Sequence, residues 1–157
     1  MINNNLVALM GLIFSGTSGF KFKNFKGEET YWANRNLYNM FLDDRYYTTY
    51  DSSNTDAGIY MLLGSGATQP TPDDYKMDSI IDGYSVIDQK HTVFTEQCDG
   101  QLLLIYRTIQ NTSDSPIIIN ETGLFGWNIM IAREVLDEPV ILEPGKKHTF
   151  TMNIGLE

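Results

Sequence analysis

The chain has 157 residues, of which 42% are hydrophobic and 20% charged, and its formal net charge is −9. This length suits one domain with a proper core, and the composition is that of a globular rather than a disordered protein. The charge is uneven, because residues 1–27 carry +3 from three lysines, which leaves −12 on the rest. An acidic body argues against nucleic acid as a partner, since neutralising phosphates takes clusters of Lys and Arg.

The most hydrophobic run in the chain extends from Leu6 to Phe14. It is too short to span a bilayer as a helix, which takes about 20 residues, so we expect no membrane partner. As a signal peptide it lacks a cationic flank, because residues 1–5 are uncharged. We expect the run to be a strand or short helix that is covered by the domain or by a neighbouring subunit.

Phenylalanine and lysine alternate between residues 20 and 26, which is the period-two pattern of a half-covered strand. A mixture of basic and aromatic residues also occurs in proteins that bind single-stranded nucleic acid, but the acidic body disfavours that reading. An extended arm lying across a partner fits better. The predicted interface residues of this arm are Leu6, Leu9, Leu12, Phe14, Phe20, Phe22 and Phe25.

Residues 30–42 are the best helix candidate, since Thr30 can cap the first turn and large side chains recur near helical spacing. Asp43 and Asp44 lie at the unfavourable end of the helix dipole. A strand is expected at 45–50 and a loop at 51–56. We therefore assign residues 1–57 to an N-terminal arm and helix region that makes attachment or oligomer contacts.

A loop built to hold one shape follows the apolar run 59–63. Its glycines can take positive φ, its prolines fix φ, and its aspartates can accept hydrogen bonds from the backbone amides that follow. The loop offers no nucleophile, so we expect it to serve packing and docking. The residues that define it are Gly64, Gly66, Pro70, Pro72, Asp73 and Tyr75.

Short β segments separated by turn residues fill the rest of the chain. Turn sequences occur at Asp99-Gly100, at 111–114 and at 143–146, and the last strand places Phe150, Met152 and Ile154 on one face. The pattern predicts a mainly β domain over residues 58–157, an antiparallel sandwich of jelly-roll or immunoglobulin-like order. The expected strands are 58–63, 84–95, 101–110, 115–122, 127–134, 139–142 and 147–154.

Catalysis has little to build on. His91 and His148 fall in expected strands, and neither a nucleophile elbow nor a phosphate-binding glycine loop occurs. Carboxylate pairs such as Glu121 with Glu134, or Asp73 with its neighbour Asp74, could in principle serve a glycosidase, but adjacent acids point apart. We expect no enzyme and no cofactor.

Metal and disulfide sites are also not expected. The lone Cys98 excludes an intrachain disulfide and a cysteine-based zinc site. Calcium would suit the loop aspartates, but the spacing of a calcium-binding loop is missing. The loop aspartates considered for calcium are Asp43, Asp44, Asp51, Asp56, Asp73 and Asp74.

Glu121 and Arg133 are the charges closest to the apolar runs 117–119 and 129–131. A charge in such surroundings needs a partner. We predict a hairpin across 124–127 that brings the two side chains together as an internal ion pair.

Three phrases in this order resemble small structural proteins encoded among the virion genes of tailed bacteriophages: residues 64–75, residues 111–124, and residues 132–136 followed by Pro144-Gly145. The resemblance covers about residues 58–155. It implies a β-sandwich component of the particle, without enzymatic activity, that decorates the capsid or belongs to a head fibre or tail.

These observations lead to the expectation of a virion structural protein that packs with copies of itself, as a trimer or ring, and with other virion proteins, and that is assembled in the bacterial cytoplasm. The alternative is a carbohydrate-binding module, for example one that contacts a host receptor at the particle surface. Exposed aromatic rings could stack on a sugar. The candidate rings are Tyr46, Tyr47, Tyr50, Tyr60, Tyr75, Tyr84 and Trp127.

Overall fold

The structure, a computed structural model, describes residues 4, 5, 8, 21–31, 58–93, 101–126 and 128–155. Strands occupy most of this part of the chain. They are β1 (Lys21–Lys23), β2 (Glu29–Tyr31), β3 (Ile59–Gly64), β4 (Tyr84–Val93), β5 (Gln101–Asn111), β6 (Ile117–Gly126), β7 (Ile129–Leu142) and β8 (Lys147–Gly155).

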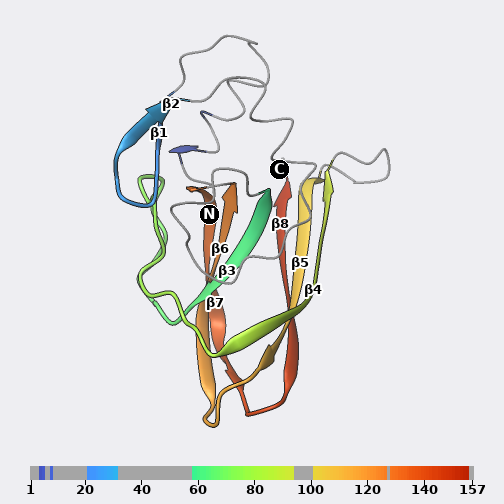
Figure 1. Ribbon diagram of the computed structural model, residues 1–157. Coiled ribbons are helices and arrows are strands. Elements are labelled where there is room, and N and C mark those ends of the chain that lie inside the picture. The colour runs from blue at the N-terminus through green and yellow to red at the C-terminus, as the bar shows by residue number, and fades with distance from the viewer. Residues whose placement is uncertain are drawn as a thin grey trace.

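The strands form three antiparallel sheets. Two have three strands each, in the orders β3-β6-β7 and β4-β5-β8, and β1 pairs with β2 as a separate hairpin. Figure 1 shows the two larger sheets as neighbouring layers, with the small hairpin beyond one end of them. The predicted mainly β fold with antiparallel sheets is confirmed.

One hydrophobic core takes side chains from both larger sheets. On β8 the residues Phe150, Met152 and Ile154 are 4–5% exposed while the intervening residues face solvent, as the alternation predicts. Alternate residues of β5 point inward in the same way, because successive side chains of a strand point to opposite faces. The buried cluster joins Ile59, Met61, Leu63, Ile105, Ile109, Ile119, Leu124, Ile131, Phe150, Met152 and Ile154, among others.

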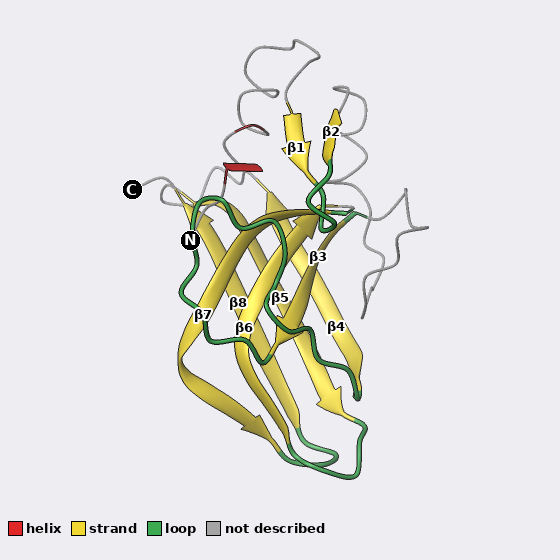
Figure 2. Cartoon of the chain, turned by 90° about the vertical axis from the view of Figure 1, so that its left-hand side faces the viewer, coloured by secondary structure: helices red, strands yellow, loops and turns green. Residues whose placement is uncertain are grey.

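Strand β3 is buried on both faces. Its residues at 59, 61 and 63 enter the main core, whereas Tyr60 and Leu62 pack on the other face against Met77, Phe125 and Met130. The loop 65–83 makes this second cluster possible, because it crosses the outer face of the β3-β6-β7 sheet (Figure 2). Burial on two sides explains why β3 is an uninterrupted apolar run rather than an alternating one.

Several strand limits differ from the prediction. β7 is one strand where two, at 127–134 and 139–142, were expected. Its pairing with β6 continues past an irregularity in which residues 136–139 lie opposite the single residue Asn120. β6 runs on to Gly126, which pairs with Ile129, so the hairpin reverses between these two residues rather than from Leu124. The expected helix start is wrong, because Thr30 pairs with Phe22 and Tyr31 with Lys21 in the β1–β2 ladder. Residues 32–42 of that expected helix lie outside the described part.

Turn predictions hold where the structure describes them. Lys146 N donates to Glu143 O at 3.0 Å, and Gly145 has φ of +73°, which is strained for other residues. At the β5–β6 connection the side chain of Asn111 accepts a hydrogen bond from Ser113 N at 2.8 Å. The turn expected at Asp99-Gly100 lies outside the described residues, although β4 and β5, which flank it, pair as a hairpin.

Candidate functional site

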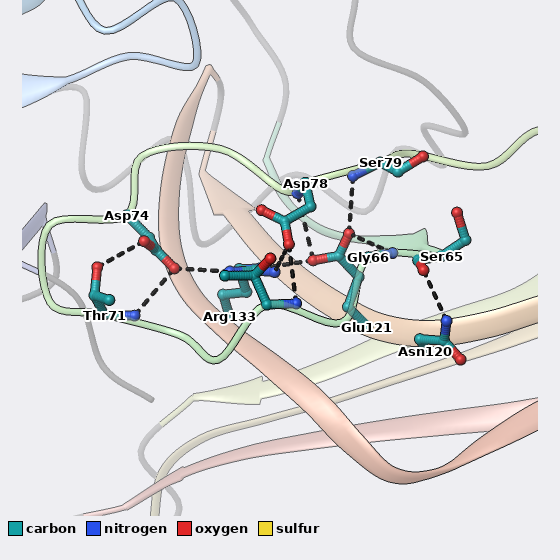
Figure 3. Close-up of polar contacts among 10 residues, drawn as sticks. Ser65, Gly66, Thr71, Asp74, Asp78, Ser79, Asn120, Glu121 and Arg133 are labelled. Atoms are coloured by element: carbon teal, nitrogen blue, oxygen red, sulfur yellow. Dashed lines mark hydrogen bonds and ion pairs between the residues drawn. The ribbon is translucent and has the colours of Figure 1, made fainter.

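The main polar cluster gathers three carboxylates around one buried arginine. Arg133 on β7 has 2% of its side chain exposed, and it pairs with Glu121 on β6 and with Asp74 and Asp78 in the loop (Figure 3). The distances are 2.6 Å from Nε to Glu121 Oε2, 2.9 Å from Nη1 to Asp74 Oδ2 and 2.7 Å from Nη2 to Asp78 Oδ2. The pairing of Glu121 with Arg133 expected from the sequence is present, and two further acids join it.

Glu121 holds both ends of the loop. Its side chain is fully buried, and Oε1 accepts hydrogen bonds from Gly66 N at 3.1 Å and Ser79 N at 3.0 Å. Gly64 and Gly66 do not have the positive φ that was predicted for them. Their role is steric, because a Cβ at either position would lie 2.5 Å from Glu121 Oε1.

The two loop aspartates are oriented by threonines as well as by Arg133. Asp74 accepts hydrogen bonds from Thr71 N and Oγ1, at 3.1 and 2.7 Å, and Asp78 accepts one from Thr68 N at 3.2 Å. Burial opposes the charged form of both carboxylates, but these hydrogen bonds and the Arg133 charge outweigh it and lower the pKa of each. Asp74 therefore bonds to a preceding amide, not a following one as expected.

The same contacts raise the pKa of the arginine. Burial alone would lower the pKa of Arg133, but the hydrogen bonds and charges of its carboxylate partners raise it. Asp74, Asp78 and Arg133 are therefore charged near neutral pH. Each charge is used to hold the loop against β6 and β7.

A second group of contacts attaches the N-terminal residues to this loop. Asn5 is 7% exposed; its Nδ2 donates to Lys23 O at 2.9 Å and Met130 O at 3.0 Å, and its Oδ1 accepts from Lys23 N at 2.9 Å. Asn4 N donates to Pro72 O at 2.8 Å, and Asn4 Nδ2 donates to Asp73 Oδ1 at 2.8 Å. The amide side chains thus join β1, β7 and the loop.

An open recess of about 160 Å³ lies where these pieces meet. One side is the β1–β2 hairpin and the other is the segment Pro72–Tyr75 of the loop. Three of the six predicted loop residues, Pro72, Asp73 and Tyr75, line it, whereas Gly64 and Gly66 lie against Glu121 instead. Pro70 is in the same loop and does not line the recess.

The residues predicted to form a subunit interface differ in where the structure places them. Phe22 is 1% exposed and belongs to the main core, so its assignment to a subunit interface is wrong: the chain itself covers the ring. Phe25 is partly exposed, and its backbone N donates to Asn128 O at 3.0 Å. Leu6, Leu9, Leu12, Phe14 and Phe20 lie outside the described residues.

Arg107 was not anticipated from the sequence. It is fully buried between Ile105 and Ile109 on β5, and its Nε donates to Gln89 Oε1 at 2.6 Å. In the described part of the chain, Nη1 and Nη2 have no hydrogen bond of ordinary geometry. Burial lowers the pKa of Arg107 to about 10, although Tyr84 and Tyr60 favour its charge. The alternation of β5 contained the signal, since a residue midway between two inward isoleucines must also point inward.

The residues considered for catalysis have different surroundings in the described part of the chain. His148 is exposed and lies against the Phe150 ring, with centroids 4.6 Å apart. The side chain of Glu121 is fully buried, so a substrate could not contact it, whereas Glu134 is exposed. Within the same residues no three side chains are grouped as metal ligands, and no helix has the length and apolar character to cross a membrane.

The candidate sugar-stacking rings are mostly not available in the described part. Tyr60 is 4% and Tyr84 7% exposed, and Tyr60 stacks on Phe125. Tyr75 is partly exposed at the recess. Tyr46, Tyr47, Tyr50 and Trp127 lie outside the described residues, as do Cys98 and the aspartates at 43, 44, 51 and 56.

Comparison with known proteins gives no relative: no family model, no curated protein and no solved structure matches the chain.

Proposed function

We propose that the chain is a structural protein of a bacteriophage virion, acting through protein–protein packing and without catalysis. The observation that carries the proposal is the use of a buried arginine and three carboxylates to hold one loop in a single shape. A loop fixed in this way presents the same surface in every copy, which repeated assembly needs, because little conformational entropy is lost on contact. The order of the three sequence phrases that resemble virion proteins adds to this argument.

We further infer that the two facing sheets form one antiparallel sandwich of the jelly-roll or immunoglobulin-like kind. Support comes from the core that the two sheets share and from the order of the strands. The hairpin β6–β7 shares its sheet with β3, and the hairpin β4–β5 shares its sheet with β8, so the chain crosses between the sheets after β3, after β5 and after β7. We assign residues 1–57 to the N-terminal region that makes attachment or oligomer contacts.

An exposed apolar pair supports contacts with other proteins. Ile118 on β6 and Ile141 on β7 are directly opposite each other in the ladder, and they are 51% and 61% exposed. Adjacent apolar side chains on an outer sheet face are what a subunit contact covers. Copies of the same chain, arranged as a trimer or ring, and other virion proteins are the proposed partners.

Mass spectrometry of purified particles of the phage that carries the gene tests the proposal. The chain should be present in a fixed ratio to the main capsid protein: hundreds of copies would place it on the capsid, and a few to a few dozen in a tail, vertex or fibre. Light scattering of the purified chain should in addition give an oligomer. A chain that is monomeric in solution and missing from particles would refute the proposal.

A further inference from the structure

The recess between the β1–β2 hairpin and the loop has the size and access of a small-ligand site. Its volume of about 160 Å³ corresponds to about five water molecules at about 30 Å³ each. Two of its lining residues, Phe22 and Asn5, are buried, whereas Lys21, Lys23 and Glu29 are exposed.

The charges around the recess are matched before any ligand arrives. Lys21 Nζ is 2.8 Å from Glu29 Oε2, and Asp74 pairs with Arg133. Asp73 accepts a hydrogen bond from Asn4, and Lys23 Nζ lies 5.8 Å from the centroid of the Tyr75 ring.

The lining contains three carboxylates and two ammonium groups, so an anion such as phosphate gains little there. The described residues also provide no group of three metal ligands for a cation. The polar groups nevertheless keep unused capacity, because an ammonium group has three donors and a carboxylate has about four acceptor positions. A neutral ligand that both donates and accepts hydrogen bonds fits this lining.

An apolar wall stands beside these polar groups. Pro72 and the partly exposed Tyr75 line the recess, and the Tyr75 ring lies close to Gly27, where a Cβ would be 3.2 Å from its Cζ. A pyranose ring has an apolar C–H face and a rim of hydroxyls, so it can lie against such a wall while its hydroxyls reach the charged rim. We propose that this recess binds one neutral saccharide unit.

Rigidity favours such binding. The wall segment is fixed by Asp74, which bonds to Arg133 and to Thr71, and by the backbone bond from Asn4 to Pro72. A recess formed in advance loses less entropy when a ligand enters.

Amide chemical shifts of the ¹⁵N-labelled full chain would test the proposal during titration with glucose, galactose, N-acetylglucosamine and rhamnose at millimolar concentrations. At least one of these sugars should shift signals of residues 21–31 and 72–75. Tyr75→Ala and Asp73→Ala should each weaken the apparent affinity by about tenfold or more. The matched controls, Tyr106→Ala on the outward face of β5 and Asp114→Ala in the β5–β6 turn, should leave it unchanged.

The proposal is overturned if none of the four sugars shifts these signals, or if both recess variants bind as well as the natural chain. It is equally overturned if only charged probes, N-acetylneuraminic acid or glucose 6-phosphate, bind. Should Tyr75→Ala fail to fold, Asp73→Ala decides, because Asp73 is an exposed loop residue. A chain absent from phage particles that still binds a neutral sugar would refute the structural role and leave the recess site standing.

Discussion

The substitution Glu121→Gln probes the ion network directly. It changes no heavy-atom shape, yet it removes the charge and replaces one acceptor oxygen by an NH₂ donor. If the remaining oxygen still accepts from Gly66 N and Ser79 N, the new NH₂ group faces Arg133 Nε. In the natural chain that nitrogen lies 2.6 Å from Glu121 Oε2. If the amide is turned round, the NH₂ group faces the two backbone donors instead. Either orientation sets donor against donor.

The expected cost follows from these contacts. Removing one partner of a buried ion pair typically destabilises by about 3–5 kcal/mol, because the other charge stays buried and uncompensated. Here Asp74 and Asp78 continue to pair with Arg133, which places the loss near the lower limit, at about 3 kcal/mol. For a chain of this length that corresponds to a fall in melting temperature of about 6–12 °C.

Urea and thermal unfolding of both proteins, followed by circular dichroism, measure this difference. Limited proteolysis gives a second readout, since Lys76 lies in the loop that Glu121 holds and should be cut faster in the variant. Glu134→Gln is the matched control: the same chemistry at the exposed residue next to Arg133 should change stability by less than about 0.5 kcal/mol. A loss below about 1 kcal/mol in Glu121→Gln, or equal losses in the two variants, would refute the assigned role.

Three further predictions concern other parts of the structure. Because the folded-state pKa of Asp74 is lowered, its contribution to stability is present above about pH 5 and is lost as the pH falls through about 4 and below. Urea midpoints measured across this range should fall less steeply with decreasing pH in the Arg133→Gln variant than in the natural chain. Gly66→Ala should destabilise by more than about 2 kcal/mol, because its Cβ would lie 2.4 Å from the Asp78 Cβ, and thermal unfolding should show it. Arg107→Met should leave the free energy of unfolding within about 1 kcal/mol or increase it, since the guanidinium is buried without full hydrogen bonding from the described residues; a loss above about 3 kcal/mol in urea would contradict this reading.

Local patterns carried the parts of the fold that were predicted well. The alternation of Phe150, Met152 and Ile154 depends only on the two-residue period of a strand, and the turn at Gly145 depends on one residue that accepts positive φ. Glu121 with Arg133 was predictable for a related reason: both charges stand beside apolar runs, and one hairpin joins them.

Features that depend on distant residues were not predictable in this way. Gly66 must be glycine because Glu121, 55 positions later, occupies the space of its Cβ. Asp74 and Asp78 join the network only because the loop crosses the sheet formed by β6 and β7. Thr30 reads as a helix cap locally, but its pairing with Phe22 places it in a strand, so tertiary pairing overrode local preference.

Asp74 connects the two sites described here. Its Oδ2 binds Arg133 at the network, and the same residue lines the recess beside Tyr75. The free-energy changes caused by perturbing the two sites should therefore not be additive, since both sites fix the position of one loop segment. A ligand bound in the recess stabilises the loop conformation that Arg133 and Glu121 also stabilise, so at one ligand concentration it should protect the natural chain against unfolding more than a variant with a weakened network, in which that conformation is less populated. Under this coupling, loosening the network also loosens the recess, and a sugar that binds the natural chain should bind the Glu121→Gln variant more weakly even though Glu121 does not touch the recess.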